Sequence, residues 1–166
     1  MGNVVVTDIT REQVFEWLRD VPDPELPVLS ITDLGIVRDV TIGDDVCVAL
    51  SPTYSGCPAT EMIEQSVIAA LHDRGLDDVS IERTLSPPWT TDWISDEGRE
   101  KLLQYGIAPP EKGGGKRALL DGMRVIACPR CASTDTELIS EFGSTACKAS
   151  YRCVACLEPF EYFKCI

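Results

Sequence analysis

The chain has 166 residues, 44% of them hydrophobic, and a formal net charge of −12. This length suggests one domain, or one domain with a small module, and the composition argues against disorder. An acidic surface repels phosphates, which disfavours nucleic-acid binding, and no run of about 18 apolar residues is present to span a membrane. The first residues lack the basic and apolar regions of a secretory signal, so we expect a cytoplasmic protein.

The first part of the chain predicts a helix followed by two strands. The helix is expected at residues 11–19, where Thr10 and Gln13 can form a capping box. Two runs of strand-like residues, 36–42 and 46–50, follow the helix. The short turn between them predicts a β-hairpin.

The strongest helical pattern begins at Ala59 and ends near Gly75, with apolar residues recurring at helical spacing. A third strand is expected at residues 79–85 and a short helix at 96–105. Helix, two strands, helix and strand in this order predict a small α+β domain, with helices on one face of a mixed sheet.

A linker is expected at APPEKGGGKR, residues 108–117, which is rich in proline, glycine and charge. The charge changes there: residues 1–108 carry 20 Asp/Glu and 7 Lys/Arg, whereas residues 109–166 carry 7 and 8. We therefore expect a domain over residues 1–108, a linker over 109–121 and a second module over 122–166.

Four cysteines of the second module form two Cys-x-x-Cys pairs, Cys128 with Cys131 and Cys153 with Cys156. Two residues between the cysteines let each pair turn both sulfurs toward one point, so that two pairs can surround a Zn²⁺ ion. Strands between the pairs would complete a zinc ribbon. Structural zinc is the predicted cofactor, and the alternatives are an iron–sulfur cluster and a disulfide or redox dithiol.

Three further cysteines have different settings. Cys47 alternates with apolar residues in the strand 46–50, and we expect it in the core. Cys147 and Cys165 are interpreted as packed or free thiols. The alternatives for these two are that they act as substitute metal ligands or pair with each other.

Aromatic residues after the α+β pattern are candidates for docking or for packing. Trp89 and Trp93 fit an exposed docking patch as well as a filler between the two modules. Phe160, Tyr162 and Phe163 alternate in a strand-like run and are expected to pack.

Cys57 is the candidate reactive thiol, in the motif Ser55-Gly56-Cys57-Pro58. Because proline suits the first position of a helix, Cys57 is expected at or near the N-cap, where free N–H groups and the helix dipole favour a thiolate. The alternative is a small buried side chain at a helix start. The one histidine, His72, would lie roughly 22 Å along a continuous helix and could not act as the base for Cys57 in the same subunit.

Three motifs together resemble the SufT-like family of iron–sulfur assembly factors: Asp23-Pro24-Glu25, Asp33-Leu34-Gly35-Ile36-Val37 and Ser55-Gly56-Cys57-Pro58. The resemblance covers about residues 10–86. It implies a compact α+β domain in which Cys57 is the reactive cysteine. It also makes Asp23 and Glu25 candidate acidic helpers, with solvated loop acids as the alternative.

The remaining half is similar to the PaaD family of phenylacetyl-CoA epoxidase components, also called PaaJ, through SPPWTTDWIS, CPRC and FGSTACKASYRCVACLEPFEYFKCI. This similarity implies a role in bacterial phenylacetate degradation. There, a di-iron monooxygenase receives electrons from a reductase that carries flavin and an iron–sulfur cluster. The implied partners are the reductase and oxygenase subunits. A homodimer is also expected, because small domains of the family often pair.

The resemblance implies an accessory maturation factor rather than an enzyme, with the iron–sulfur cluster of the reductase as the expected target. Cys57 would hold iron or a cluster transiently, or bind a partner's thiol. With one histidine, the chain lacks the ligands for a di-iron centre of its own. The alternatives are a structural adaptor of the oxygenase complex, which would not need Cys57, and a thiol-based electron carrier.

Overall fold

The computed structural model describes residues 8–113 and 124–164 of the chain. Its contacts divide the chain into two compact units, with the division between Trp89 and Thr90. The expected linker lies partly outside the described residues.

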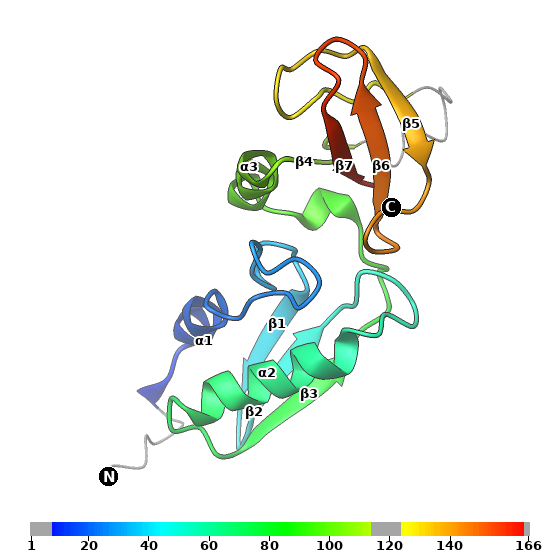
Figure 1. The fold of residues 1–166 in the computed structure, drawn as a ribbon. Coiled ribbons are helices and arrows are strands. Elements are labelled where there is room, and N and C mark those ends of the chain that lie inside the picture. Colours follow the sequence, from blue (N-terminus) through cyan, green and yellow to red (C-terminus); the bar gives the residue numbers. More distant parts are fainter. Residues whose placement is uncertain (1–7, 114–123, 165–166) are drawn as a thin grey trace. The chain divides into compact units, whose positions relative to one another are not determined.

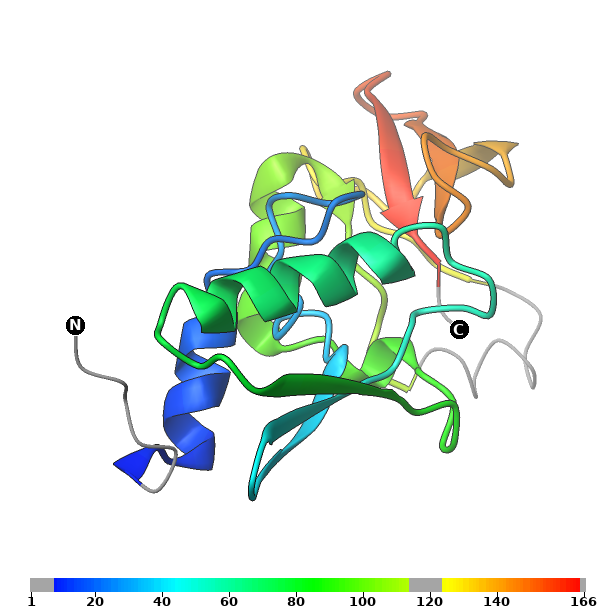
Figure 2. The ribbon, with the colours of Figure 1, turned by 90° about the horizontal axis from the view of Figure 1, so that it is seen from below.

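The first unit contains two helices and a three-stranded sheet. Its elements are α1 (Arg11–Leu18), β1 (Val37–Ile42), β2 (Val46–Leu50), α2 (Thr60–His72) and β3 (Val79–Arg83). The strand order is β1-β2-β3, with β1 antiparallel and β3 parallel to β2. Figures 1 and 2 show α2 along one face of this sheet. The predicted α+β fold with a mixed sheet is therefore confirmed.

The core of this unit follows from the periodicity of β2. Val46, Val48 and Leu50 are at most 2% exposed and lie on one face, where each contributes about 2 kcal/mol by burial. Cys47 is only partly buried, so its predicted core position is wrong. Side chains alternate along a strand, which turns Cys47 to the face opposite its apolar neighbours.

The proline-rich segment between α1 and β1 is well ordered by its own hydrogen bonds. Pro22 and Ser30 form an antiparallel bridge, and the N–H of Asp23 donates to the carbonyl of Leu29 at 2.8 Å. Asp33 Oδ2 accepts from the N–H of Ser30, and the Ser30 hydroxyl accepts from the N–H of Asp33, both at 3.0 Å. These bonds fix the loop that carries Asp23.

Trp89 closes the first unit. Its side chain is 4% exposed, and its Nε1–H donates to the carbonyl of Leu34 at 2.7 Å. Trp89 is therefore a packing residue of this unit and does not form an exposed docking patch. Trp93 is partly buried in the second unit.

The second unit contains a short helical segment, a helix and a four-stranded sheet. Its elements are a 3-10 helix η2 (Thr91–Trp93), α3 (Asp96–Tyr105), β4 (Ile107–Ala108), β5 (Thr136–Ser140), β6 (Lys148–Cys153) and β7 (Pro159–Phe163). The strand order is β4-β7-β6-β5. The sequence pattern assigns residues 90–108 to the first domain, whereas the contacts group them with this unit, because β4 pairs with β7.

Aromatic side chains fill the core of the second unit. Phe160, Tyr162 and Phe163 are 7%, 4% and 1% exposed, so the expectation that they pack is confirmed. The ring of Tyr151 stacks on Phe160 with centroids 6.0 Å apart. Phe160, Tyr162 and Ile126 form one cluster with Cys128 and Cys153, and Tyr151 and Cys156 pack against it.

An ion pair between a buried lysine and a partly buried glutamate joins β6 to β7. Lys148 is 4% exposed, and its Nζ lies 3.0 Å from Glu161 Oε2. The N–H of Ser144 donates to Glu161 Oε1 at 2.6 Å. Burial acts to raise the pKa of Glu161, but the hydrogen bonds from Ser144 and Lys148 outweigh it and lower the pKa.

The helices in the described part of the chain are all too short or too polar to span a membrane.

Candidate functional site

The four cysteines of the two Cys-x-x-Cys pairs converge on one point. Their sulfur atoms all lie within 4.8 Å of one another. The sulfurs of Cys128 and Cys156 are 3.8 Å apart, and those of Cys131 and Cys153 are 3.6 Å apart. Four sulfurs at about 2.3 Å from one ion, at tetrahedral angles, would be about 3.8 Å apart. The spacing therefore fits a single four-thiolate metal ion.

The first cysteine pair forms a tight turn. The N–H of Cys128 donates to the carbonyl of Ser133, and the N–H of Ala132 donates to the carbonyl of Cys128, both at 2.9 Å. Ala132 adopts a positive φ of 60°, which closes the turn. The N–H of Arg130 donates to the Cys128 sulfur at 3.4 Å, which adds a further contact within the turn.

The second pair repeats this geometry. The N–H of Cys153 donates to the carbonyl of Glu158 at 2.9 Å, and the N–H of Leu157 donates to the carbonyl of Cys153 at 3.0 Å. Leu157 has a φ of 64° in the position equivalent to Ala132. Two equivalent turns that face one another are the arrangement predicted for a ribbon-type metal site.

The sulfurs perturb one another's ionisation. A hydrogen bond from the N–H of Cys156 is the main cause that lowers the pKa of Cys153 to about 7. The N–H of Glu158 acts to lower the pKa of Cys156, but burial and the three neighbouring thiols outweigh it and raise that pKa to about 12. Cys153 therefore ionises far more easily than Cys156. A bound dication would replace the protons that the sulfurs share in its absence.

Within the ribbon group, the sulfur separations of 3.6 and 3.8 Å are those of separate thiols, since a disulfide bond is about 2.05 Å long.

Two further cysteines of the second module lie outside the ribbon group. Cys147 is buried and contacts the Thr145 hydroxyl at 3.0 Å, as expected of a packed thiol. Cys165 lies outside the described residues.

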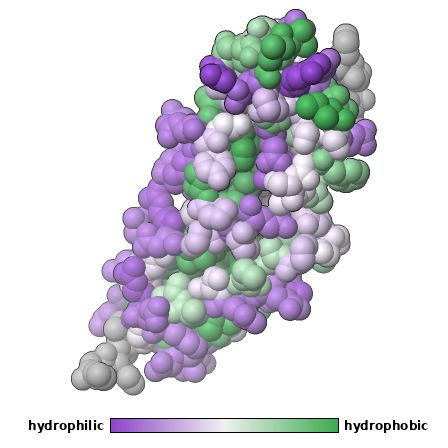
Figure 3. Space-filling view, in the orientation of Figure 1, coloured by the Kyte–Doolittle hydropathy of each residue, from purple (hydrophilic) through white to green (hydrophobic). Residues whose placement is uncertain are grey.

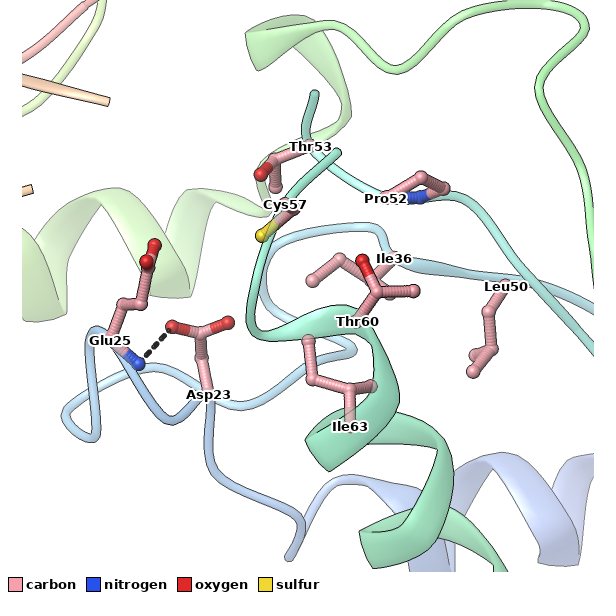
Figure 4. A pocket seen from close by; sticks show the side chains of 9 residues that line it. All are labelled: Asp23, Glu25, Ile36, Leu50, Pro52, Thr53, Cys57, Thr60 and Ile63. Atoms are coloured by element: carbon pink, nitrogen blue, oxygen red, sulfur yellow. Dashed lines mark hydrogen bonds between the residues drawn. The ribbon is translucent and has the colours of Figure 1, made fainter. Parts of the chain in front are cut away.

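Cys57 lies at the edge of a small pocket in the first unit (Figure 4). The pocket has a volume of about 20 Å³, which is room for about one water-sized atom. Cys57 and Thr53 come from the segment between β2 and α2, and Asp23 and Glu25 come from the proline-rich loop. Figure 4 shows the Cys57 sulfur and the two carboxylates around the same space. The fold thus brings the three candidate residues of the first unit into one pocket.

Asp23 is a buried acid with one oxygen available to the pocket. It is 6% exposed, and its Oδ1 accepts from the N–H groups of Glu25 at 2.9 Å and Leu26 at 2.7 Å. Its Oδ2 has no hydrogen-bond partner among the described residues. Burial raises the pKa of Asp23, although the two N–H donors act to lower it. Asp23 is therefore no solvated loop acid, and its carboxylate is a better proton acceptor than an exposed one. Glu25 is partly exposed at the rim.

The helix after Cys57 begins later than predicted. Ala59 is the N-cap of α2, and Thr60 is its first residue. The N–H of Thr60 donates to the carbonyl of Cys57 at 3.2 Å, so a turn over residues 57–60 precedes the helix. Pro58 is compatible with both structures, because a fixed φ suits a turn as well as a first helical position. Cys57 therefore precedes the N-cap, and Gly56, with a φ of 79°, turns the chain toward it.

Some pocket residues are not identifiable from the sequence. Thr53, Thr60 and Ile36 also line the pocket around Cys57. Each is an ordinary residue of a loop or an element end, and only the fold brings them together. No set of three metal-binding side chains in the described residues, other than the ribbon cysteines, has its ligand atoms as close together. The pocket is consequently an incomplete ligand set.

The second unit presents apolar side chains on its surface. Figure 3 shows hydrophobic surface over the turn between β6 and β7. Leu157 is 69% and Val154 44% exposed in this turn, beside the second cysteine pair. These side chains are candidates for contacts with a partner protein.

Comparisons with known proteins match both units. Residues 11–82 match the family described as iron–sulfur cluster assembly protein, and residues 112–164 match the PaaD zinc β-ribbon domain. Two solved structures resemble part of the chain. A domain of unknown function, DUF59, from Bacillus anthracis has a TM-score of 0.52 and 26% identity, and covers 55% of this chain and 90% of its own. A conserved hypothetical protein from Thermotoga maritima has a TM-score of 0.50 and 35% identity, and the match covers 61% of this chain and 98% of that protein.

Curated relatives match nearly the whole chain or part of it. The chain is 51% identical over 155 residues to a protein of Escherichia coli (strain K12) named as the putative D component of 1,2-phenylacetyl-CoA epoxidase; the match spans 93% of this chain and 92% of that protein. A protein of Porphyromonas gingivalis named Fe-S protein maturation auxiliary factor is 35% identical over 59% of this chain and 92% of its own. The chain therefore belongs to the PaaD family, in which an iron–sulfur cluster assembly domain is joined to a four-cysteine zinc ribbon.

Proposed function

We propose that the chain is an accessory maturation factor, and not an enzyme, for a metal centre of phenylacetyl-CoA epoxidase. The proposed target is the iron–sulfur cluster of the reductase subunit. One observation carries the proposal: Cys57 shares a pocket with a buried carboxylate, Asp23, in a domain that matches iron–sulfur assembly proteins. This role requires a cytoplasmic protein that contacts the reductase and oxygenase subunits.

Cys57 would be the thiol that takes iron, or a cluster, as cargo. A thiol must lose its proton before it binds a metal, and Asp23 Oδ2 faces the same pocket with no hydrogen-bond partner among the described residues. The raised pKa of Asp23 suits it to accept that proton. Glu25, at the rim, would add a negative charge that attracts the cation. Because this ligand set is incomplete, it would hold cargo weakly enough to release it.

The ribbon would hold zinc as a resident structural ion through Cys128, Cys131, Cys153 and Cys156. The tetrahedral spacing of these sulfurs supports the assignment. Zinc there supplies folding free energy and no reaction. The ribbon would present its exposed apolar turn to the partner subunits, and the homodimer expected from the family is part of the proposal.

The test is to produce the reductase in cells that contain this protein, its Cys57→Ser variant, its Cys47→Ser variant or none of them. We expect full iron and sulfide content with the unchanged protein and with Cys47→Ser, because Cys47 lies on the opposite face of the sheet from the core. Cys57→Ser should resemble the cells without the protein. Full loading of the reductase with Cys57→Ser, together with normal epoxidase activity, would instead favour a structural adaptor.

A further inference from the structure

β3 is the edge strand of the sheet in the first unit. Val46 donates its N–H to the carbonyl of Asp78 at 2.9 Å, and Thr84 donates to the carbonyl of Leu50 at 2.9 Å. In the parallel register of β2 and β3, these bonds show that the even-numbered residues from 78 to 84 direct their backbone N–H and carbonyl groups toward β2. The N–H and carbonyl groups of Val79, Ile81 and Arg83 consequently face the outer edge. No strand pairs with that edge in the described part of the chain.

A groove opens where this edge ends. It has a volume of about 460 Å³ and is lined by residues of three segments: the Cys57 turn, the first turn of α2 and the end of β3. Cys57 therefore lies between two hollows. The inner pocket has room for about one small atom, whereas the outer groove has the volume of a typical ligand site. Arg83, the last residue of β3, and Leu85 carry the strand edge into the groove.

The charge of the groove is negative. The guanidinium of Arg83 donates to both carboxylate oxygens of Glu64, and this pairing neutralises the positive charge of Arg83. Glu61 lines the groove and is exposed, and its negative charge adds to that of Glu64 beside Arg83. The surroundings add to this charge, because residues 1–89 contain 16 Asp/Glu and 5 Lys/Arg. A segment that enters the groove is therefore favoured when it is positively charged.

We propose that the β3 edge and this groove bind an extended, positively charged segment of the client protein, which carries a cysteine to Cys57. The segment would pair with the outward N–H and carbonyl groups of β3 and continue into the groove, as in strand addition to other sheet edges. Its cysteine would supply a metal ligand that the inner pocket lacks. This inference rests on the proposed function, since it names the kind of partner that the Cys57 site receives.

The proposal can be tested with peptides and the full-length, metal-loaded protein. The probe is a seven-residue peptide that alternates lysine and valine around a central cysteine, carried as its mixed disulfide with thionitrobenzoate. The Cys57 thiolate attacks the peptide cysteine sulfur, the bond to thionitrobenzoate breaks, and that group leaves as a coloured thiolate. Each peptide bound covalently therefore releases one thionitrobenzoate, and the rate measured with Cys57→Ser is subtracted.

We expect the lysine peptide to react about tenfold faster than a matched glutamate peptide at low salt, with a smaller difference at high salt. Glu61→Lys should slow the lysine peptide about fivefold, while Glu12→Lys, the same charge change on the exposed start of α1, should leave the rate within about twofold. Methylation of alternate peptide amides should slow the reaction in one register and leave it unchanged in the other, since only one set faces β3.

Equal rates for the two peptides, or equal effects of both methylation registers, would overturn the proposal. The methylated peptides test strand pairing without altering the protein, so a folding defect of a variant cannot mimic the result. If the peptides fail to discriminate while Cys57 is still needed to load the reductase, the docking site is refuted and the proposed function stands. If they discriminate while Cys57 is dispensable for loading, the proposed function is refuted.

Discussion

Removal of the metal should unfold the ribbon and leave the first unit intact. Few large apolar side chains pack beside the cysteines. Four of the five residues of β5 are exposed, and the cluster beside the cysteines contains three large apolar side chains, Ile126, Phe160 and Tyr162. At about 2 kcal/mol each, their burial contributes about 6 kcal/mol. A structural four-cysteine zinc site contributes about 10–16 kcal/mol, so the ion outweighs this cluster.

The assay is an amide ¹H–¹⁵N correlation spectrum of the full chain before and after treatment with a strong chelator. We expect the resonances of residues 124–158 to collapse into the unfolded range, while those of residues 11–83 stay in place. Cys128→Ser should reproduce the chelated spectrum. Cys147→Ser is the matched control, because this buried thiol lies outside the four-sulfur group, and it should keep both metal and fold. A chelated protein that keeps a dispersed ribbon spectrum would refute the reasoning.

Further predictions concern single residues and pH. Leu157→Gly should raise the stability of the metal-loaded ribbon to heat by about 0.5–1 kcal/mol, because φ is 64° and the side chain is 69% exposed; a loss of stability would show that Leu157 packs in the fold. Trp89→Phe leaves the Leu34 carbonyl without its donor and should cost about 1–3 kcal/mol in urea unfolding of the first unit, whereas an unchanged midpoint would contradict the role of this bond. Burial raises the pKa of Asp23 in the folded state, so its stabilising effect is complete below the unfolded pKa and is lost as pH rises through the folded value. Asp23→Asn, whose amide oxygen can still accept both N–H bonds, should remove this pH dependence. If the stability of this variant changes with pH in parallel with that of the unchanged protein, the role of Asp23 is refuted. Metal affinity should fall as pH drops and should fall most steeply below about 7, where even Cys153 becomes protonated, and titration of metal against pH checks this.

The parts of this structure that depend on local pattern could be predicted from the sequence. The capping box of Thr10 and Gln13 starts α1 as expected, because both of its hydrogen bonds are local. The two Cys-x-x-Cys pairs likewise determine the metal site, since each turn brings its own sulfurs together. The alternation of β2 contained the information that Cys47 faces away from the core, but its apolar neighbours concealed it.

The pocket around Cys57 depends on contacts between distant segments. Asp23 reaches it because the bridge between Pro22 and Ser30 folds the proline-rich loop back, and no periodicity indicates such a bridge. Pro58 could not distinguish a turn from a helix start. The grouping of residues 90–108 with the second unit depends on two residues of β4, a strand too short to leave a sequence pattern.

The most direct measurement of the central claim is anaerobic reconstitution of the apo-reductase. Iron and sulfide are supplied, and the visible absorbance of the reductase cluster is followed over time with the unchanged protein, with Cys57→Ser or with neither. The account predicts that the unchanged protein accelerates cluster formation and that Cys57→Ser performs no better than its absence. Equal acceleration by the two proteins would contradict the assignment of Cys57 as the thiol that handles iron.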